Sequence, residues 1–83
     1  MAPTWDYRYE LTNFVRHGDG SYSYTCRSEG NIPWRENLES TILMLNAWET
    51  ARLAAEKTGK DAIVYVIGKR IVCRTRTRID NAA

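Results

Sequence analysis

The chain has 83 residues, a net charge of +2 and a hydrophobic fraction of 43%. This length predicts one domain over residues 1–83, and the apolar content argues against a disordered chain. No apolar run approaches the roughly 18–20 residues of a membrane-spanning helix, and residues 1–6 lack the basic and apolar regions of a signal peptide. We therefore expect a cytoplasmic protein whose two cysteines, Cys26 and Cys73, are reduced.

Charge is distributed unevenly along the chain. Residues 1–61 contain 7 Lys or Arg and 9 Asp or Glu, which sum to −2, whereas residues 62–83 contain 5 Lys or Arg and 1 Asp, which sum to +4. This asymmetry indicates either an acidic partner for the C-terminal segment or a solvated basic edge.

Polar and apolar residues alternate in two runs, the pattern of half-buried strands. The first run spans residues 5–15, and Phe14 and Val15 break its phase, which indicates either a bulge near Asn13 or the end of the regular pairing. A glycine-containing turn at residues 17–20 leads into the second run, residues 21–27, so the two runs form a hairpin. Four tyrosines are expected to share one buried face of this hairpin: Tyr7, Tyr9, Tyr22 and Tyr24. If that face were outward, its rings could instead stack on nucleic-acid bases.

Residues 38–58 predict one long amphipathic helix, after a loop over residues 28–36. Asn37 is a suitable N-cap, and Gly59 is a suitable residue to end the helix in a left-handed conformation. Apolar residues recur at three- and four-residue steps along one side. We expect this side to bury Leu45 and Trp48.

Residues 62–67 and 70–79 predict two further strands, joined by a two-residue type II′ turn at Gly68-Lys69. A right-handed crossover from the second strand through the helix places the third strand beside the first. The predicted fold is therefore α+β with element order ββαββ: a four-stranded antiparallel sheet in the order 2-1-3-4, with one helix packed on one face. The order 1-2-3-4 is the alternative, and it needs a parallel pair.

The two-residue turn fixes the register of the second hairpin, so alternate residues share the face away from the helix. This face combines an apolar centre with arginines: Ile63, Tyr65, Ile67, Val72, Arg70, Arg74, Arg76 and Arg78. Such a mixture is typical of a protein-binding interface. Two purely structural roles are the alternatives, because arginine stems can shield apolar residues and arginines can protect an edge strand. Trp34, in the loop, is a further candidate contact or a cap on the core.

The usual chemistry of enzymes and metal sites is missing from the sequence. His17 is the only histidine, and with two separated cysteines it cannot complete a zinc site of the usual kinds. No glycine-rich phosphate loop follows a strand. We therefore expect a non-enzymatic protein with no catalytic residue, no metal and no cofactor.

A hairpin, one helix and two closing strands follow one another in stretches that include Gly20-Ser21-Tyr22, Ala47-Trp48-Glu49 and Ile63-Val64-Tyr65-Val66. This order is similar to that of small phage-encoded inhibitors of host machines, including several anti-CRISPR proteins and an inhibitor of bacterial RNA polymerase. The resemblance covers most of the chain as an order of elements, and it assigns no functional residue. It implies a protein that occludes a surface of a larger complex in the host cytoplasm.

The sequence thus favours a small binding protein, of the kind that phages or mobile elements use to inhibit a host nucleic-acid-handling complex such as a CRISPR–Cas effector. Its partner would offer an acidic or nucleic-acid-binding surface. The alternative is direct nucleic-acid binding by the four strand arginines, which repeat at about 6.6–6.8 Å per two residues. A homodimer that buries the same face is a third hypothesis.

Overall fold

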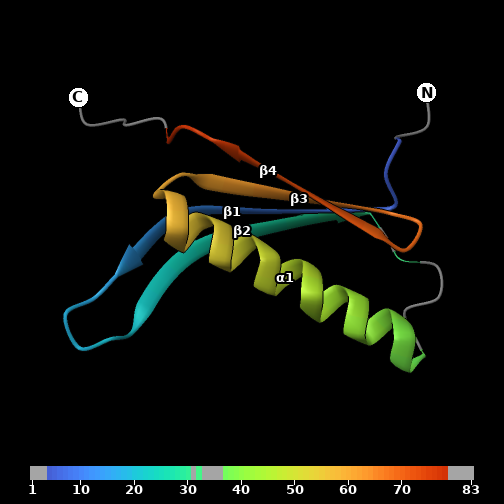
Figure 1. Cartoon of the computed structure of the whole chain (residues 1–83), viewed down its shortest axis with the longest axis horizontal. Coiled ribbons are helices and arrows are strands. Elements are labelled where there is room, and N and C mark those ends of the chain that lie inside the picture. Colours follow the sequence, from blue (N-terminus) through green and yellow to red (C-terminus); the bar gives the residue numbers. More distant parts are fainter. Residues whose placement is uncertain (1–3, 31, 33–36, 79–83) are drawn as a thin grey trace.

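The computed structural model describes residues 4–30, 32 and 37–78. Its elements follow in the order β1 (Tyr7–Arg16), β2 (Tyr22–Gly30), α1 (Leu38–Thr58), β3 (Asp61–Ile67) and β4 (Arg70–Arg76). The strands form one antiparallel sheet in the order β2-β1-β3-β4, and α1 lies along one face of it (Figure 1). The predicted α+β fold and its strand order are confirmed.

The first hairpin has a bulge near Asn13, one of the two predicted alternatives. Its register shifts between Thr12 and Val15, and Asn13 adopts a positive φ of 56°. The extra residue of the bulge lets β1 bend at this point, while the pairing with β2 continues on either side. β2 continues to Gly30, three residues beyond the predicted strand end, so the predicted loop begins later than expected.

β2 lies at the edge of the sheet, and this position overturns part of the predicted burial. Tyr7 and Tyr9 on β1 are buried as expected, but Tyr22 and Tyr24 on β2 are 40% and 42% exposed. The helix packs on β1, β3 and β4. The predicted burial of all four tyrosines is therefore wrong for the two on β2, because one helix is too narrow to cover four strands.

The helix begins and ends where the sequence predicts. Asn37 is its N-cap and accepts a hydrogen bond from the Ser40 amide, while Gly59 ends it with a φ of 71°. The side that faces the sheet is a row of small residues: Ser40, Ala47, Ala51 and Ala55. The prediction that the helix buries Leu45 and Trp48 is wrong, since these side chains are 53% and 38% exposed.

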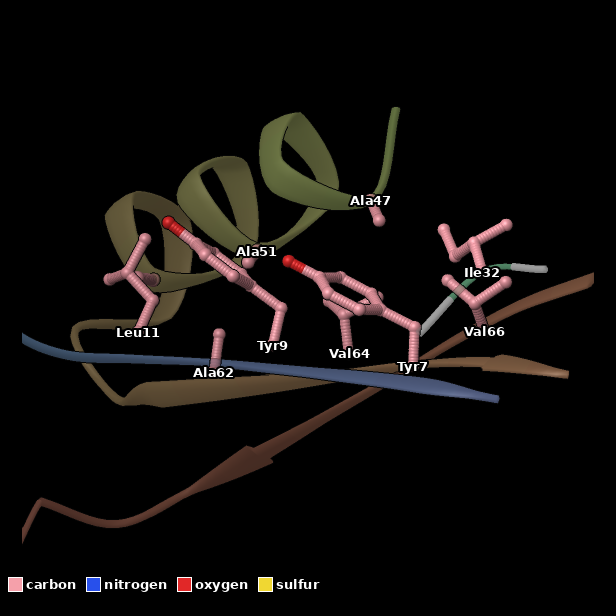
Figure 2. Packing of buried hydrophobic residues seen from close by; sticks show 10 residues of the cluster. Tyr7, Tyr9, Leu11, Ile32, Ala47, Ala51, Ala62, Val64 and Val66 are labelled. Atoms are coloured by element: carbon pink, nitrogen blue, oxygen red, sulfur yellow. The ribbon is translucent and has the colours of Figure 1, made fainter. Parts of the chain in front are cut away.

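The composition of the core explains why the small residues of α1, and not Leu45 and Trp48, face the sheet. Most large side chains of the core come from the strands. Figure 2 shows Tyr7, Tyr9 and Leu11 rising from β1 toward the alanines of α1. Small residues on the helix and large residues on the sheet interdigitate, which allows close packing without a void. Burial also raises the pKa of Tyr9.

The second hairpin has the predicted register, with Ile67 opposite Arg70 and Tyr65 opposite Val72. Gly68 has a φ of 64°, and Lys69 does not have a positive φ. This combination is the type II′ turn, since type I′ requires positive φ at both central residues. The pairing places Val64 and Val66 in the core and sends their neighbours to the opposite face.

Candidate binding face of the sheet

We call the sheet face opposite α1 the open face. The pairings Glu10–Ile63–Arg74 and Arg8–Tyr65–Val72 run across β1, β3 and β4 on this side. The open face therefore carries the second-hairpin residues that the sequence predicts as contacts. Trp34 lies outside the described residues.

A hollow of about 300 Å³ lies on the open face near the turn between β3 and β4. Its lining mixes polar and apolar surface and includes aromatic side chains, a threonine and one cation: Thr4, Trp5, Tyr65, Ile67, Val72 and Arg74. Ile67 is 43% exposed there, and Tyr65 and Val72 are half-buried. Four of the six lining residues are among those predicted from the sequence, so the structure brings the predicted apolar centre together around a concave site.

Trp5 is the wall that sequence reasoning missed. Its ring lies 6.2 Å from that of Tyr65, between centroids. The neighbouring Asp6 holds the N-terminal segment against the hairpin turn, since its amide donates to the Val66 carbonyl at 2.9 Å and its carboxylate accepts from the Gly68 amide at 2.7 Å. The predicted antiparallel pairing of β1 with β3 could have indicated this contact, because it brings the start of β1 close to the turn between β3 and β4. The sequence does not specify the register of that pairing, so Trp5 could not be placed.

Gly30 leaves room for Trp5. It has a φ of 87°, and a Cβ built on it would lie 2.8 Å from Cζ3 of Trp5 and would also collide with the Asp6 carbonyl oxygen. A side chain at this position would displace the N-terminal segment, because real Cβ atoms do not approach other atoms so closely. The end of β2 therefore helps to shape a hollow on the other strands.

Tyr65 is held on two sides. Besides Trp5, the guanidinium of Arg8 lies 5.9 Å from the centre of the Tyr65 ring. Arg8 also donates to Glu10 at 2.7 Å, and this hydrogen bond lowers the pKa of the Glu10 carboxyl group. A ring fixed by neighbours loses little conformational freedom on binding, which favours a role as an anchor.

The shielding that the sequence left open occurs at Ile63, which is only 8% exposed. Glu10 and Arg74 flank it on the neighbouring strands. Glu10 also pairs with Arg76 at 3.2 Å. Ile63 is therefore covered by its neighbours on the open face. The exposed apolar surface of this face lies closer to the turn between β3 and β4, at Ile67.

The four predicted arginines are not equivalent. Arg76 is paired with Glu10, and Arg78 is directed to the bulge of β1, where it donates to the Phe14 carbonyl at 2.8 Å and lies 3.7 Å from Asp61. Arg70 and Arg74 are exposed, and within residues 4–30, 32 and 37–78 neither forms an ion pair. Two of the four arginines thus keep their charge available beside the hollow.

Other candidate chemistry is sparse in the part of the chain that the structure describes. Cys26 is exposed and Cys73 is half-buried, and both are free thiols. Cys26 on β2 stays exposed because α1 packs on β1, β3 and β4. No group of three or more His, Cys, Asp or Glu residues there is arranged to hold a metal ion. Among these residues, no helix is long and apolar enough to cross a bilayer.

Comparisons with protein-family models, with curated proteins and with solved structures find no match to this chain.

Proposed function

We propose that this protein is a non-enzymatic binding protein whose open face receives a side chain of a partner protein. The observation that carries the proposal is the hollow, with aromatic and apolar walls and Arg74 in its lining, on a sheet face opposite the only helix of the described residues. Aromatic residues and arginines around an apolar centre are the composition of binding hot spots.

The chemistry of the hollow indicates the kind of partner. Trp5 and Tyr65 suit an apolar or aromatic side chain, while Arg74 and the nearby Arg70 suit a carboxylate beside it. We therefore propose a protein partner with an apolar residue next to an acidic one. Inhibition of a host nucleic-acid-handling complex, such as a CRISPR–Cas effector in the host cytoplasm, is the specific form of the proposal, and it is supported by the resemblance in element order alone.

Direct nucleic-acid binding is the second candidate, and the ion pairs weigh against it. With Arg76 and Arg78 engaged by Glu10 and Asp61, two strand arginines remain to neutralise phosphates. Two contacts correspond to a slope of about −1.4 to −1.8 in log affinity against log salt, instead of about −3 for four. The aromatic and apolar members of the lining, Trp5, Tyr65, Ile67 and Val72, have no use in holding a phosphate.

Two matched isoleucine variants test the proposal. Ile67 in the hollow is 43% exposed, and Ile42 on the helix is 49% exposed. We expect Ile67→Ala to abolish retention of a specific protein from an extract of the source cells, and Ile42→Ala to leave it unchanged. Binding to an unstructured single-stranded oligonucleotide is measured in parallel by fluorescence anisotropy at several salt concentrations.

Each result is decisive. If Ile67→Ala and Ile42→Ala retain the partner protein equally well, the hollow does not contribute to binding. Tight oligonucleotide binding that falls steeply with salt, requires Arg70 and Arg74, and ignores Ile67→Ala would replace the protein partner by a nucleic acid.

A further inference from the structure

The two edges of the sheet are built differently. One edge is β4, a seven-residue strand with three arginines, Arg70, Arg74 and Arg76. Charged side chains on an edge strand prevent pairing with another sheet. The other edge is β2, which is nine residues long and uncharged from Tyr22 to Cys26. It contains no proline or lysine, and the bulge of the hairpin lies in β1. One edge is thus protected, and the other is suited to pairing.

Exposed aromatic residues accompany the unprotected edge. Tyr22 and Tyr24 of β2 are exposed and stack on each other, and the half-buried Phe14 of β1 stacks on Tyr22, with ring centroids 6.1 Å and 5.4 Å apart. All three rings lie on the helix side of the sheet, and Cys26 is exposed on the same side. Apolar side chains that one copy of the chain leaves exposed beside an open strand edge are the features of a strand-pairing interface.

The charges around these rings argue against a nucleic acid as the occupant. Arg16 and Arg52 both lie over the Tyr22 ring, at 5.8 Å and 5.5 Å from its centre. Both are already paired with Glu56, and Arg52 is also paired with Glu49. Neutralised arginines contribute little to phosphate binding. The occupant that fits is therefore a polypeptide strand that places no like charge opposite Arg27 or Glu29 of β2.

We propose that this strand is β2 of a second copy of the same chain. Antiparallel pairing about a two-fold axis beside Thr25 places Arg27 opposite Ser23 and Glu29 opposite Ser21. No two like charges face each other in this register, and Tyr24 lies opposite Cys26 of the other copy. Such an isologous contact joins the two sheets into one of eight strands.

The inference goes beyond the proposed function, because β2 and the hollow use different parts of the sheet. An axis normal to the sheet keeps both helices on one side and both open faces on the other. A dimer would thus present two hollows in the same direction. Two linked sites bind a repeated or symmetric partner more tightly than one site does.

Two threonine variants test the dimer. The mass of one chain is 9.6 kDa, so light scattering during size-exclusion chromatography should give twice that value for the wild type. Thr25→Lys places two ammonium groups at the axis and should shift the protein to a monomer. Thr75→Lys adds the same charge to an exposed threonine of β4 and should leave the dimer intact. Urea midpoints show whether both variants are folded.

Cross-linking at Cys26 tests the register independently. A short bis-maleimide should join two chains of the wild type and of Cys73→Ser, and should fail with Cys26→Ser. A wild type that is monomeric up to about 1 mM, the range of weak complexes, would overturn the proposal. So would a dimer that tolerates Thr25→Lys and is lost in Ile67→Ala, since that dimer would use the open face.

Discussion

A single part-buried hydrogen bond reports on how the helix packs on the sheet. The Trp48 indole Nε1 donates to the Tyr7 hydroxyl at 2.9 Å, linking α1 to β1 over 41 residues of sequence. Trp48 also lies 6.1 Å from the ring of Tyr9, between centroids. These contacts require the rotation of α1 about its axis that points its alanines at the sheet. A rotation that placed Trp48 in the centre of the core would move its indole away from the Tyr7 hydroxyl.

The bond should be visible as a coupling energy. Trp48→Phe and Tyr7→Phe each remove one partner, and each should lower the free energy of unfolding by about 1 kcal/mol, the usual net value of such a bond. The double variant should cost less than the sum of the two, by about 0.5–1.5 kcal/mol. Because Trp48 is 38% exposed, Trp48→Ala should cost about 2–3 kcal/mol, below the 3–5 kcal/mol of a fully buried aromatic residue.

Urea unfolding followed by circular dichroism measures all four free energies. The slope with denaturant should be the same for each variant, so that shifts in the midpoint report stability. Trp48→Phe combined with Tyr24→Phe is the matched control cycle, and it should be additive. Additivity in the Tyr7 cycle as well would refute the hydrogen bond and with it the roll of the helix.

Three further perturbations test the core, the open face and the thiols. Ala51→Leu should destabilise the fold by about 1–3 kcal/mol in the same assay, because Ala51 has no exposed surface and the added methylenes overpack the helix–sheet contact. The hydrogen bond from Arg8 lowers the pKa of Glu10 in the folded state, so its contribution is present above its ordinary pKa and is lost as the pH falls through the lower folded value. The stability difference between wild type and Glu10→Gln should accordingly shrink as urea midpoints are measured from pH 7 to pH 3. Cys26 should react with a thiol reagent before Cys73, because Cys26 is exposed and burial raises the pKa of Cys73.

Local signals made most of the fold predictable. The Gly68-Lys69 turn set the second hairpin register residue by residue, because a two-residue loop permits only one pairing. Asn37 and Gly59 marked the helix ends through capping chemistry that involves only neighbouring residues. The strand order followed from the handedness of the crossover, which also needs no knowledge of side-chain contacts.

The errors arose where distant parts of the chain meet. The apolar stripe of α1 is wide enough to allow several rotations, and the choice between its alanines and its larger residues depends on the tyrosines of β1. The exposure of Tyr22 depends on the width of one helix over four strands. The position of Trp5 beside the hollow depends on the register between β1 and β3. No turn connects these two strands directly, so no loop length specifies that register.

On the open face, residues of β1 that are distant in sequence from β4 give the two ends of β4 different surroundings. The sequence of β4 alone suggested one uniform basic surface. Arg70, Arg74 and Arg76 lie on one side of β4, with Val72 between the first two, yet β1 supplies Glu10 at one end of the strand and the Trp5 segment reaches the other. Where Glu10 lies, charge is neutralised and Ile63 is covered. Where Trp5 lies, no carboxylate of the described residues pairs with Arg74, and the apolar side chains stay open around a hollow. A uniform basic stripe would favour a polyanion, whereas this division, set by β1, favours one localised contact with a protein side chain.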